Sequence, residues 1–393
     1  MKELRTFFEM TSLTLLPLLV LFLAVFGPVK RAEGERGTGP ASPASSAAPV
    51  STAPSAAPTA ARAAAEASTL PALPASAAEA SPAPAGSEAP AAPAEGEEAA
   101  AVFASVSRDG ETEVDILFGS RTETMTLRDY LLGVVAAEMP ASFEPAALEA
   151  QAVAARTDTF YRLLVARPHP GAASCTDPGC CKAYLSPEEL RRRWGEDYDR
   201  WAERIAAAVD ATDGEILTWE GEPIFAAFHA CSEGYTEACE DVWAAALPYL
   251  RSVPTLETEA DVPSFRSTVR YGIEELRSLL LEKVPGAVLP EDPAAWLRGE
   301  KTSASGRLLS LEVGGVTLSG SALRRLLGLR STKLRWSCAD GVFTFETAGY
   351  GHGVGLSQYG AEVMAREGGT CEEILLHYYP GTELTDLGEV FPG

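Results

Sequence analysis

The chain has 393 residues, with 32 lysines and arginines against 55 aspartates and glutamates, and its formal net charge is −23 at pH 7. This surplus of negative charge excludes non-specific nucleic-acid binding and leaves no polybasic patch for an anionic membrane surface. The composition changes sharply along the chain, so its parts are best considered in order.

The first part contains an apolar run, LTLLPLLVLFLAVFGPV, at residues 13–29. This is about the shortest length that spans a bilayer. A signal peptide is the alternative, but no A-x-A cleavage site follows directly and Lys30 and Arg31 close the run. We therefore predict an uncleaved membrane anchor at residues 1–31 with a transmembrane helix at about 13–29. The basic residues on its two sides balance, so charge does not settle its orientation.

Residues 32–100 are rich in alanine, proline, serine and glutamate and contain almost no large apolar side chains. Such a segment cannot bury enough surface to offset the entropy of ordering it. We predict a disordered linker here. Residues 101–393 are long enough for one large domain or for a domain with an insertion.

The pattern of residues 101–393 is mixed. Strands and helices do not alternate in a βαβ rhythm, which predicts an α+β domain rather than a doubly wound sheet. In the first half of this segment we expect a helix from Glu144–Pro145 to about 164, a capped helix over 186–210, and a hairpin over 214–230 that turns at Glu220–Gly221. In the second half we expect a helix over 273–284, a hairpin over 308–320, a short helix over 321–327 and paired strands at 334–337 and 342–346. The last two elements are a helix ending near 367 and a capped helix from 370 to about 379.

Glu138 is the first candidate for chemistry. It follows the small apolar stretch 131–137 and precedes Met139–Pro140, and a residue before proline is biased away from helical angles. An acid at the mouth of an apolar wall loses solvation, which raises its pKa as a general acid near neutrality requires. A surface glutamate at a helix end is the alternative interpretation.

One histidine and three cysteines, His169, Cys175, Cys180 and Cys181, lie within thirteen residues of a proline- and glycine-rich loop. These are ligand types of a structural zinc site. Adjacent cysteines rarely both bind one metal, so we expect His169, Cys175 and Cys181 as ligands and leave Cys180 open. A loop disulfide and free thiols remain alternatives.

The segment FHACSEGYTEACEDVW at 228–243 gathers several polar groups after a strand. Ser232 or Cys231 beside His229 has the residue types of a covalent nucleophile, but no nucleophile elbow surrounds them, so we disfavour this chemistry. Cys231 and Cys239 are candidates for a disulfide outside the cytoplasm.

The segment GYGHGVGLSQYGAEVMAREGGT at 349–370 is rich in glycine but lacks the spacing of a phosphate-binding loop. Glycines let the backbone pass close to a ligand or to another strand. Two compatible interpretations stay open: a tight strand-to-helix corner, or a sugar-binding wall that presents His352, Ser357, Gln358 and Tyr359.

Together these motifs resemble the SpoIID/LytB family. The resemblance rests on YLLGVVAAEMPASFEPAALEAQAVAART, FHACSEGYTEACEDVW, LGLRST, GHGVGLSQYGA and EEILLHYYPGTEL, and it covers about residues 120–386 in the family's order. It implies a lytic transglycosylase that cuts peptidoglycan glycan strands already freed of stem peptides, acting in forespore engulfment during sporulation. It also implies a single-pass protein of the cell membrane with an extracytoplasmic domain, and a cell-wall amidase and other engulfment membrane proteins as partners.

Carried onto this sequence, the resemblance assigns catalysis to Glu138, Arg156 and Tyr235. We also expect His229 to bind substrate, together with the four polar residues of the glycine-rich segment. The cysteine loop is similar to a zinc loop of clostridial members, although Cys180-Cys181 departs from the family's single cysteine there. The implied chemistry needs no cofactor, because one acid suffices when the sugar's own 6-hydroxyl is the nucleophile. A non-catalytic, glycan-binding enhancer of a cell-wall amidase is the main alternative, and a structural tether between membranes is a third.

Overall fold

The computed structural model describes residues 109–243 and 245–390. The predicted anchor at 1–31 and the predicted linker at 32–100 lie outside these residues. Within the described ranges, no helix combines the length and the apolar character needed to cross a membrane.

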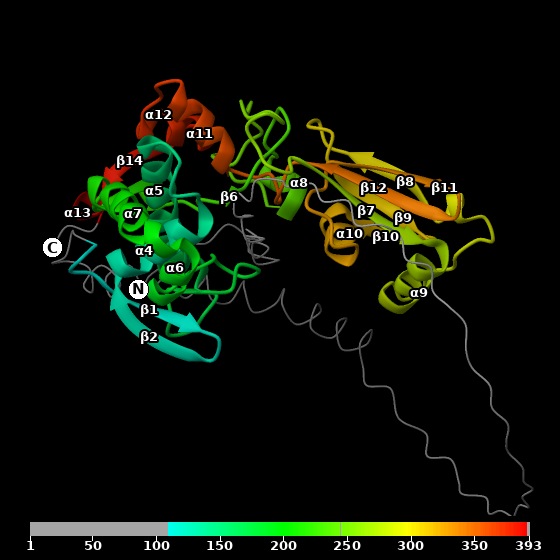
Figure 1. The fold of residues 1–393 in the computed structure, drawn as a ribbon, viewed down its shortest axis with the longest axis horizontal. Helices are drawn as coiled ribbons and strands as arrows, with labels where there is room; N and C mark the ends of the chain where they lie inside the picture. Colours follow the sequence, from blue (N-terminus) through cyan, green and yellow to red (C-terminus); the bar gives the residue numbers. More distant parts are fainter. Residues whose placement is uncertain (1–108, 244, 391–393) are drawn as a thin grey trace, which may run out of the picture. The chain divides into compact units, whose positions relative to one another are not determined.

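Helices and short sheets are mixed along the described chain, which confirms the α+β class. One hydrophobic core is built from elements at both ends of the described sequence (Figure 1). Its elements are β1 (Glu113–Phe118), β2 (Arg121–Thr126), α4 (Leu127–Glu138), α5 (Pro145–Tyr161), β3 (Ser174–Cys175), α6 (Pro187–Trp194), α7 (Tyr198–Ala211), β4 (Glu215–Trp219), β5 (Glu222–Pro223), β6 (Phe228–His229), α8 (Cys239–Trp243), β13 (Leu356–Ser357), α11 (Gln358–Arg366), α12 (Cys371–Tyr378), β14 (Glu383–Asp386) and α13 (Leu387–Val390).

Helix α5 is the centre of this core. All but four of its seventeen residues are buried, and it contacts α4, α7, α11, α12 and β4. Its sequence, PAALEAQAVAARTDTFY, is rich in alanine, which favours helix and lets several neighbours pack closely against it. Pro145 stands at its first turn, where the missing N–H costs nothing. The polar residues of α5 are therefore forced to find partners inside the protein.

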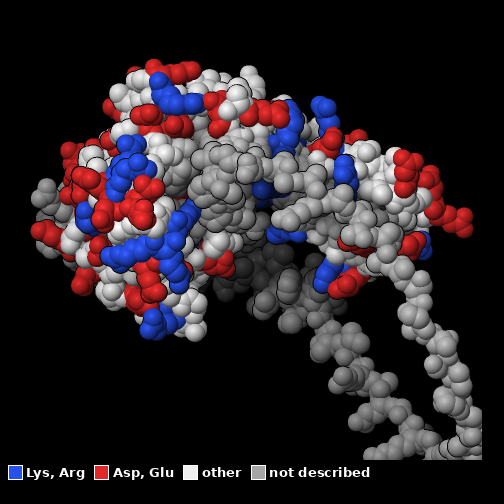
Figure 2. Space-filling model, in the orientation of Figure 1, with Lys and Arg blue, Asp and Glu red and all other residues white. Residues whose placement is uncertain are grey.

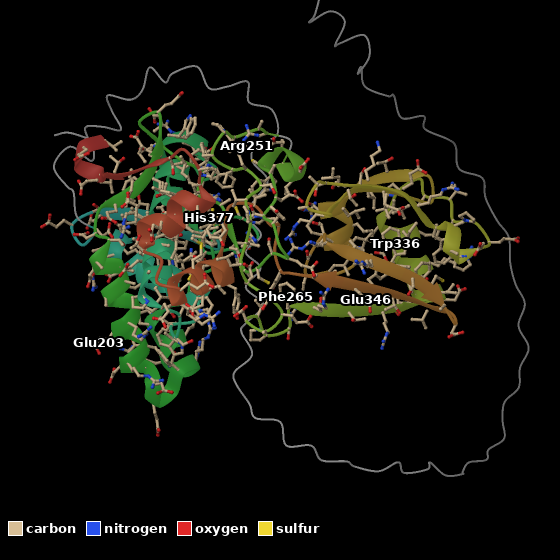
Figure 3. The ribbon with its side chains drawn as sticks, turned by 90° about the horizontal axis from the view of Figure 1, so that it is seen from above. Glu203, Arg251, Phe265, Trp336, Glu346 and His377 are labelled. Carbon is tan, nitrogen blue, oxygen red and sulfur yellow. The ribbon has the colours of Figure 1, made fainter. Side chains whose placement is uncertain are left out.

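A second core lies between two three-stranded antiparallel sheets and two helices. Its elements are β7 (Arg266–Gly272), α9 (Ile273–Lys283), β8 (Leu297–Thr302), β9 (Leu308–Val313), β10 (Val316–Ser319), α10 (Gly320–Leu326), β11 (Leu334–Ala339) and β12 (Val342–Ala348). Burial alternates along β7, β10 and β11, as expected for sheets with one solvated face. Trp336 on β11 packs against the core while Glu346 on the neighbouring β12 is exposed (Figure 3).

The two cores meet at a cluster of buried polar side chains, which we call the polar joint: His229, Ser232, Glu237, Arg307 and His352. Arg307 donates from Nη2 to Ser232 Oγ (2.9 Å), and Glu237 accepts from the hydroxyls of Ser303 and Ser305 (2.7 and 2.8 Å). Residues 303–307 precede β9 of the second core, so the joint is made of hydrogen bonds rather than apolar contacts.

Most predicted elements are present, and two predictions were wrong. The helix predicted over 186–210 is broken into α6, a short 3-10 turn at Gly195–Asp197, and α7, because Gly195 adopts φ 55°, which ends a helix. The hairpin over 214–230 turns at Glu220–Gly221 as predicted but ends at Pro223, and β6 pairs instead with β13 in parallel. Proline cannot donate to a ladder, which is consistent with this early end.

Acidic and basic side chains are interspersed over the visible face of the described residues (Figure 2). The negative net charge of the sequence therefore does not appear on this face as one acidic field.

Candidate active site

The carboxylate of Glu138 lies at the last position of α4 and is 4% exposed. The helix ends there because Met139, before Pro140, is extended (φ −117°, ψ 147°), as predicted. Oε1 of Glu138 accepts a hydrogen bond from the backbone N–H of Ala183 at 2.8 Å. Oε2 lies 3.5 Å from Nε2 of Gln358. A buried carboxyl with fixed donors is the arrangement expected of a general acid and base rather than of a surface glutamate.

Ala183 is held against α4 by the absence of a side chain at Gly133. A Cβ at Gly133 would lie 2.2 Å from the ring of Tyr184 and 2.8 Å from the carbonyl oxygen of Leu185. The Leu185 N–H donates to the Gly133 carbonyl at 3.2 Å. This close approach brings the 183–185 segment, and so the N–H that binds Glu138, onto the helix.

Gln358 extends this arrangement to α5. It occupies the first position of α11, is 3% exposed, and donates from Nε2 to Oε1 of Gln151 at 3.1 Å. Gln151 is fully buried on α5. Three elements distant in sequence therefore meet at Glu138. Gln358, a residue of the predicted sugar wall, reaches the predicted acid.

Arg156 is fully buried, but its contacts are elsewhere. Its Nε and Nη2 bind both oxygens of Asp109 (2.9 and 2.5 Å), and Nη1 donates to the carbonyl of Glu215 (3.0 Å). Its remaining bonds go to Thr212 and the carbonyl of Val209. Within the described residues, none of its hydrogen bonds reaches Glu138. The catalytic role that the resemblance assigns to Arg156 therefore has no hydrogen bond to Glu138 to support it among the described residues, and it stays a prediction.

Tyr235 is 53% exposed, and its backbone pairs with Pro254. Its side chain makes no hydrogen bond or ring contact to another described residue. Its predicted catalytic role stays a prediction, since an exposed tyrosine remains free to meet a ligand.

His229, His352 and Ser357 are enclosed by protein. His229 bonds Ser232 Oγ through Nε2 (2.7 Å) and the Val354 carbonyl through Nδ1 (3.1 Å), and Ser357 donates to Glu257 (2.5 Å). Burial, aided by the neighbouring His352 and Arg307, lowers the pKa of His229 well below its usual value. Burial likewise lowers the pKa of His352 to about 3. Both imidazoles are therefore neutral parts of the polar joint.

The histidine and serine of the disfavoured nucleophile do meet, but Ser232 is fully buried and receives a hydrogen bond from Arg307. Cys231 and Cys239 are both buried free thiols here, so the disulfide considered from the sequence is not formed. Burial raises the pKa of each to about 12. Tyr359 is 7% exposed, lies edge-on to Phe143 at 5.1 Å, and borders the segment that follows Glu138.

The glycines at 349–355 are explained by close packing. A Cβ at Gly353 would lie 2.5 Å from Cζ of Arg307, and one at Gly355 would lie 1.9 Å from the Ala227 carbonyl oxygen. Both have positive φ, at 87° and 69°. The corner interpretation of this segment therefore accounts for these glycines without a ligand.

All four residues of the His/Cys loop converge, including Cys180. Their ligand atoms lie within 4.8 Å of one another. Nε2 of His169 is 3.3 Å from the sulfurs of both Cys180 and Cys181, and these two sulfurs are 3.9 Å apart. Neighbouring ligands of a tetrahedral zinc, with Zn–S about 2.3 Å and Zn–N about 2.0 Å, lie roughly 3.5–3.8 Å apart. The cluster could thus hold a metal ion with four ligands rather than the three predicted.

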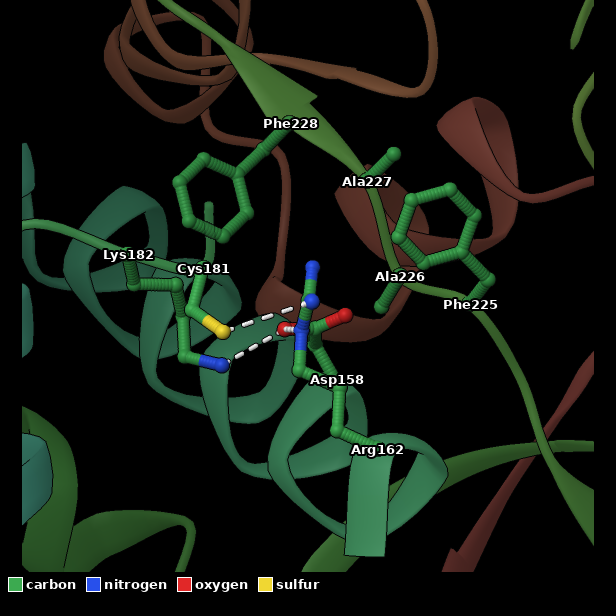
Figure 4. A pocket seen from close by; sticks show the side chains of 8 residues that line it. All are labelled: Asp158, Arg162, Cys181, Lys182, Phe225, Ala226, Ala227 and Phe228. Carbon is green, nitrogen blue, oxygen red and sulfur yellow. Dashed lines mark hydrogen bonds and ion pairs between the residues drawn. The ribbon is translucent and has the colours of Figure 1, made fainter. Parts of the chain in front are cut away.

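A buried charge network lies beside this cluster (Figure 4). Asp158 accepts from Nε of Arg162 (2.7 Å) and from Nζ of Lys182 (2.5 Å), and Arg162 also contacts Cys181 Sγ at 3.4 Å. A small cavity of about 10 Å³ adjoins Asp158, whose Oδ1 has no hydrogen-bond partner among residues 109–243 and 245–390. Burial opposes the charge of Asp158, but the two cations outweigh it and hold its pKa below the usual value. Lys182 and Ala183 are adjacent, so this network is one residue from the N–H that binds Glu138.

A groove of about 390 Å³ lies along the other side of α4. Gly133 and Ala136 form its floor, and it is lined by aromatic side chains from the loop and from two helices, namely Tyr184, Trp194 and Tyr198. Tyr184 directly follows Ala183, so the groove and the acid share one loop.

Sequence reasoning missed Ala183, Gln151, Asp109 and the inclusion of Cys180. Ala183 acts through its backbone and leaves no side-chain signal. Gln151 was detectable in principle, because it is the one amide in the alanine-rich run EAQAVAAR.

Residues 120–219 match the family model described as SpoIID, stage II sporulation protein. Stage II sporulation protein D of Bacillus subtilis (strain 168) is 38% identical over 267 residues, which cover 67% of this chain and 76% of that protein. Its counterpart in Bacillus amyloliquefaciens is 38% identical over 268 residues, 67% of this chain and 75% of that protein. The amidase enhancer of Bacillus subtilis is 28% identical over 304 residues, 65% of this chain and 40% of that protein.

The fold, the site and these likenesses together define a member of the class of stage II sporulation proteins. The chain belongs to the SpoIID family, within which it resembles stage II sporulation protein D. The resemblance drawn from its motifs is confirmed.

Proposed function

We propose that this protein is a lytic transglycosylase that cleaves peptide-free glycan strands of peptidoglycan and leaves 1,6-anhydro-N-acetylmuramic acid ends. The observation that carries the proposal is Glu138, a buried carboxyl fixed through one oxygen by a backbone N–H. The family is a sporulation family, and we propose forespore engulfment as the setting.

The two oxygens of Glu138 have different tasks in this mechanism. A backbone N–H only donates, so Oε1, bound by Ala183, stays an acceptor and we assign the transferable proton to Oε2. Oε2–H protonates the glycosidic oxygen, the bond to C1 breaks, and the carboxylate then takes the proton of the 6-hydroxyl as that oxygen closes on C1. Acid–base catalysis of this kind contributes about 10²–10⁴-fold.

The aromatic groove beside α4 supports glycan binding. Rings of Tyr184, Trp194 and Tyr198 offer flat apolar faces with polar tips, which suit the mixed surface of sugars. We propose that part of the strand lies here while Gln358 and Tyr359 border the acid from the other side.

The test incubates the full chain, solubilised in mild detergent, with denuded glycan strands and identifies the new ends by mass spectrometry. Wild type should form anhydro ends, and Glu138→Gln should form none. Glu149→Gln, a matched change of a partly buried acid on α5, should remain active. Reducing ends that gain water would instead show a hydrolase, and absence of cleavage by wild type would contradict the proposal.

A second candidate is an enhancer of a cell-wall amidase, favoured by the similarity to the amidase enhancer of Bacillus subtilis. An enhancer should raise the rate of a purified amidase on whole sacculi, and Glu138→Gln should leave this effect intact. Loss of stimulation in that variant would count against the enhancer function.

We propose that the His/Cys cluster binds one structural zinc ion through His169, Cys175, Cys180 and Cys181. Charge balance supports a divalent ion with three thiolates. Such a site carries a net charge of −1. The neighbouring network of Arg162, Lys182 and Asp158 carries a net charge of +1. Buried charges that sum to zero avoid a large desolvation cost. The ion would fix the loop that presents Ala183, and no step of the chemistry passes through it.

Cobalt substitution tests the site and its ligand number. Three thiolates around Co²⁺ should give strong sulfur-to-metal absorption in the near ultraviolet, and Cys180→Ser should weaken that band by about one third. Cys338→Ser, which changes a free cysteine of the second core, should leave it unchanged. If the intensity of the band is the same in Cys180→Ser, the ligands are instead the three residues expected from the sequence.

We further propose that residues 1–31 anchor the protein in the cell membrane with residues 101–393 outside the cytoplasm. The apolar run of the sequence supports this. Deleting residues 1–31 should release the protein from sedimented membranes, and continued sedimentation of the deletion variant would contradict the anchor.

A further inference from the structure

We infer that Gln151 is a positioning residue for the acid Glu138, acting through the amide of Gln358. This inference rests on the proposed transglycosylase function and names a residue that acts without touching the glycan.

The burial of Gln151 calls for an explanation. It is fully buried on α5 between Ala150 and Ala152, and its Nε2 has no hydrogen-bond partner in the described part of the chain. An amide buried without full hydrogen bonding destabilises the fold. An apolar side chain of similar size would fit this environment better, so the amide serves something other than packing.

The hydrogen bond between Gln151 and Gln358 indicates the role of the buried amide. Its Oε1 accepts from Nε2 of Gln358 at 3.1 Å, and the same Nε2 lies 3.5 Å from Oε2 of Glu138. An amide has one donor end and one acceptor end. By accepting from Gln358, Gln151 turns the donor end of that amide toward the carboxylate and its carbonyl oxygen away.

The oxygen held in this way is the one that transfers the proton. Ala183 binds Oε1, and Gln358 is a donor that reaches Oε2. Hydrogen bonds of a catalytic acid are often long without substrate and tighten in the substrate complex. If Gln358 rotates by half a turn, its carbonyl oxygen meets the carboxylate and repels it. Gln151 therefore acts on the chemical step and not on glycan binding.

The test measures kcat and KM for anhydro-end formation by the full chain, for Gln151→Met, Gln358→Leu and the double variant. We expect roughly a tenfold loss of kcat for each single change and a KM within about twofold of wild type. The double variant should be no slower than Gln358→Leu alone, since Gln151 acts through Gln358. Thr159→Val, which removes a buried hydroxyl of α5 whose hydrogen bond within the described structure goes to the Ala155 carbonyl, should keep the wild-type kcat.

Thermal unfolding separates positioning from a structural role. Gln151→Met removes an unpartnered buried NH2, so its Tm should equal or exceed that of wild type while kcat falls. If this variant does not fold, Gln151→Asn, which keeps the amide but shortens its reach, should show the same loss of kcat. An unchanged kcat, or additive losses in the double variant, would overturn the inference alone. A wild type that forms no anhydro ends would overturn the proposed function and this inference with it.

Discussion

At the scale of single residues, Glu138 and Arg156 show how differently two charged side chains of one motif are used. Both are buried, eighteen positions apart in sequence. Glu138 is bound by a loop and by α11, whereas the guanidinium of Arg156 is occupied by Asp109 and by backbone carbonyls. We therefore attribute stability to Arg156 and chemistry to Glu138.

Arg156→Lys tests this division. Lysine keeps the charge but cannot bind both oxygens of Asp109 as the planar guanidinium does. We expect a loss of about 1–3 kcal/mol in the free energy of unfolding, measured in urea, with kcat within about twofold of wild type. Arg200→Lys, at an exposed ion pair, should change neither. A stable Arg156→Lys variant with a strongly reduced kcat would restore the catalytic role expected from the sequence.

Asp158 provides a pH-dependent prediction. Its pKa is held below the usual value because Arg162 and Lys182 outweigh burial. A carboxylate with a lowered pKa stabilises the fold above its unfolded pKa of about 3.9, and this contribution is lost as the pH falls through the folded pKa.

Asp158→Asn should therefore cost about 3–5 kcal/mol at pH 7, because it leaves two buried cations without their carboxylate. The difference from wild type should shrink as the pH falls below about 4. Urea unfolding of both proteins at pH 7 and at a pH below about 4 measures this difference in the free energy of unfolding. A difference that is the same at both would contradict this account of the network.

At the scale of elements, the glycine-rich segment before α11 contains glycine where neighbouring segments pack closely against its backbone. Gly355 has φ 69° and the Ala227 carbonyl oxygen 1.9 Å from the site of a Cβ, whereas Gly234 has φ 80° and open space. The positive φ disfavours a side chain at both glycines, but at Gly355 the carbonyl oxygen also leaves no room for one.

Comparing Gly355→Ala with Gly234→Ala isolates the packing contribution. Gly234→Ala should cost about 1–2 kcal/mol for the left-handed backbone alone. Gly355→Ala should cost clearly more, because a backbone carbonyl cannot move aside as a flexible side chain can. Chemical denaturation measures both, and equal losses would mean that the corner is less tightly packed than its geometry indicates.

At the scale of the whole molecule, two apolar cores are joined through buried polar groups. Arg307 is 1% exposed and bonds Ser232, Ser331 and the carbonyl of Gly351. Buried polar groups contribute mainly when their partners are present. Arg307 is therefore one of the groups that couple the two cores, beside Glu237 with Ser303 and Ser305.

Arg307→Ala should weaken this coupling. We expect a loss of several-fold in the equilibrium constant of folding and, in calorimetry, a transition that broadens or splits as the second core unfolds separately. Arg298→Ala, at an exposed arginine on β8 of the same core, should retain a single transition. A single sharp transition in Arg307→Ala would show that the cores are coupled by other contacts.

The sequence by itself determined the α+β class, the family, most element positions and the place of Glu138 at the end of a helix. These follow from local signals: a proline after Met139, capping residues at Ser186 and Thr370, and an Asp-Gly turn at 340–341. It failed at Gly195, where a glycine with positive φ breaks the helix locally, and after Pro223, where the strand partner comes from a segment distant in the chain.

The tertiary structure alone decided which polar groups share a site. Glu138, Ala183, Gln358 and Gln151 come from four separate segments, and one of them acts only through its backbone. Arg156 and His229 received their distant partners, Asp109 and the carbonyl of Val354, in the same way. The physical reason is that a buried polar group must be satisfied by whatever the packing brings within about 3 Å, and periodicity along the chain carries no information on that.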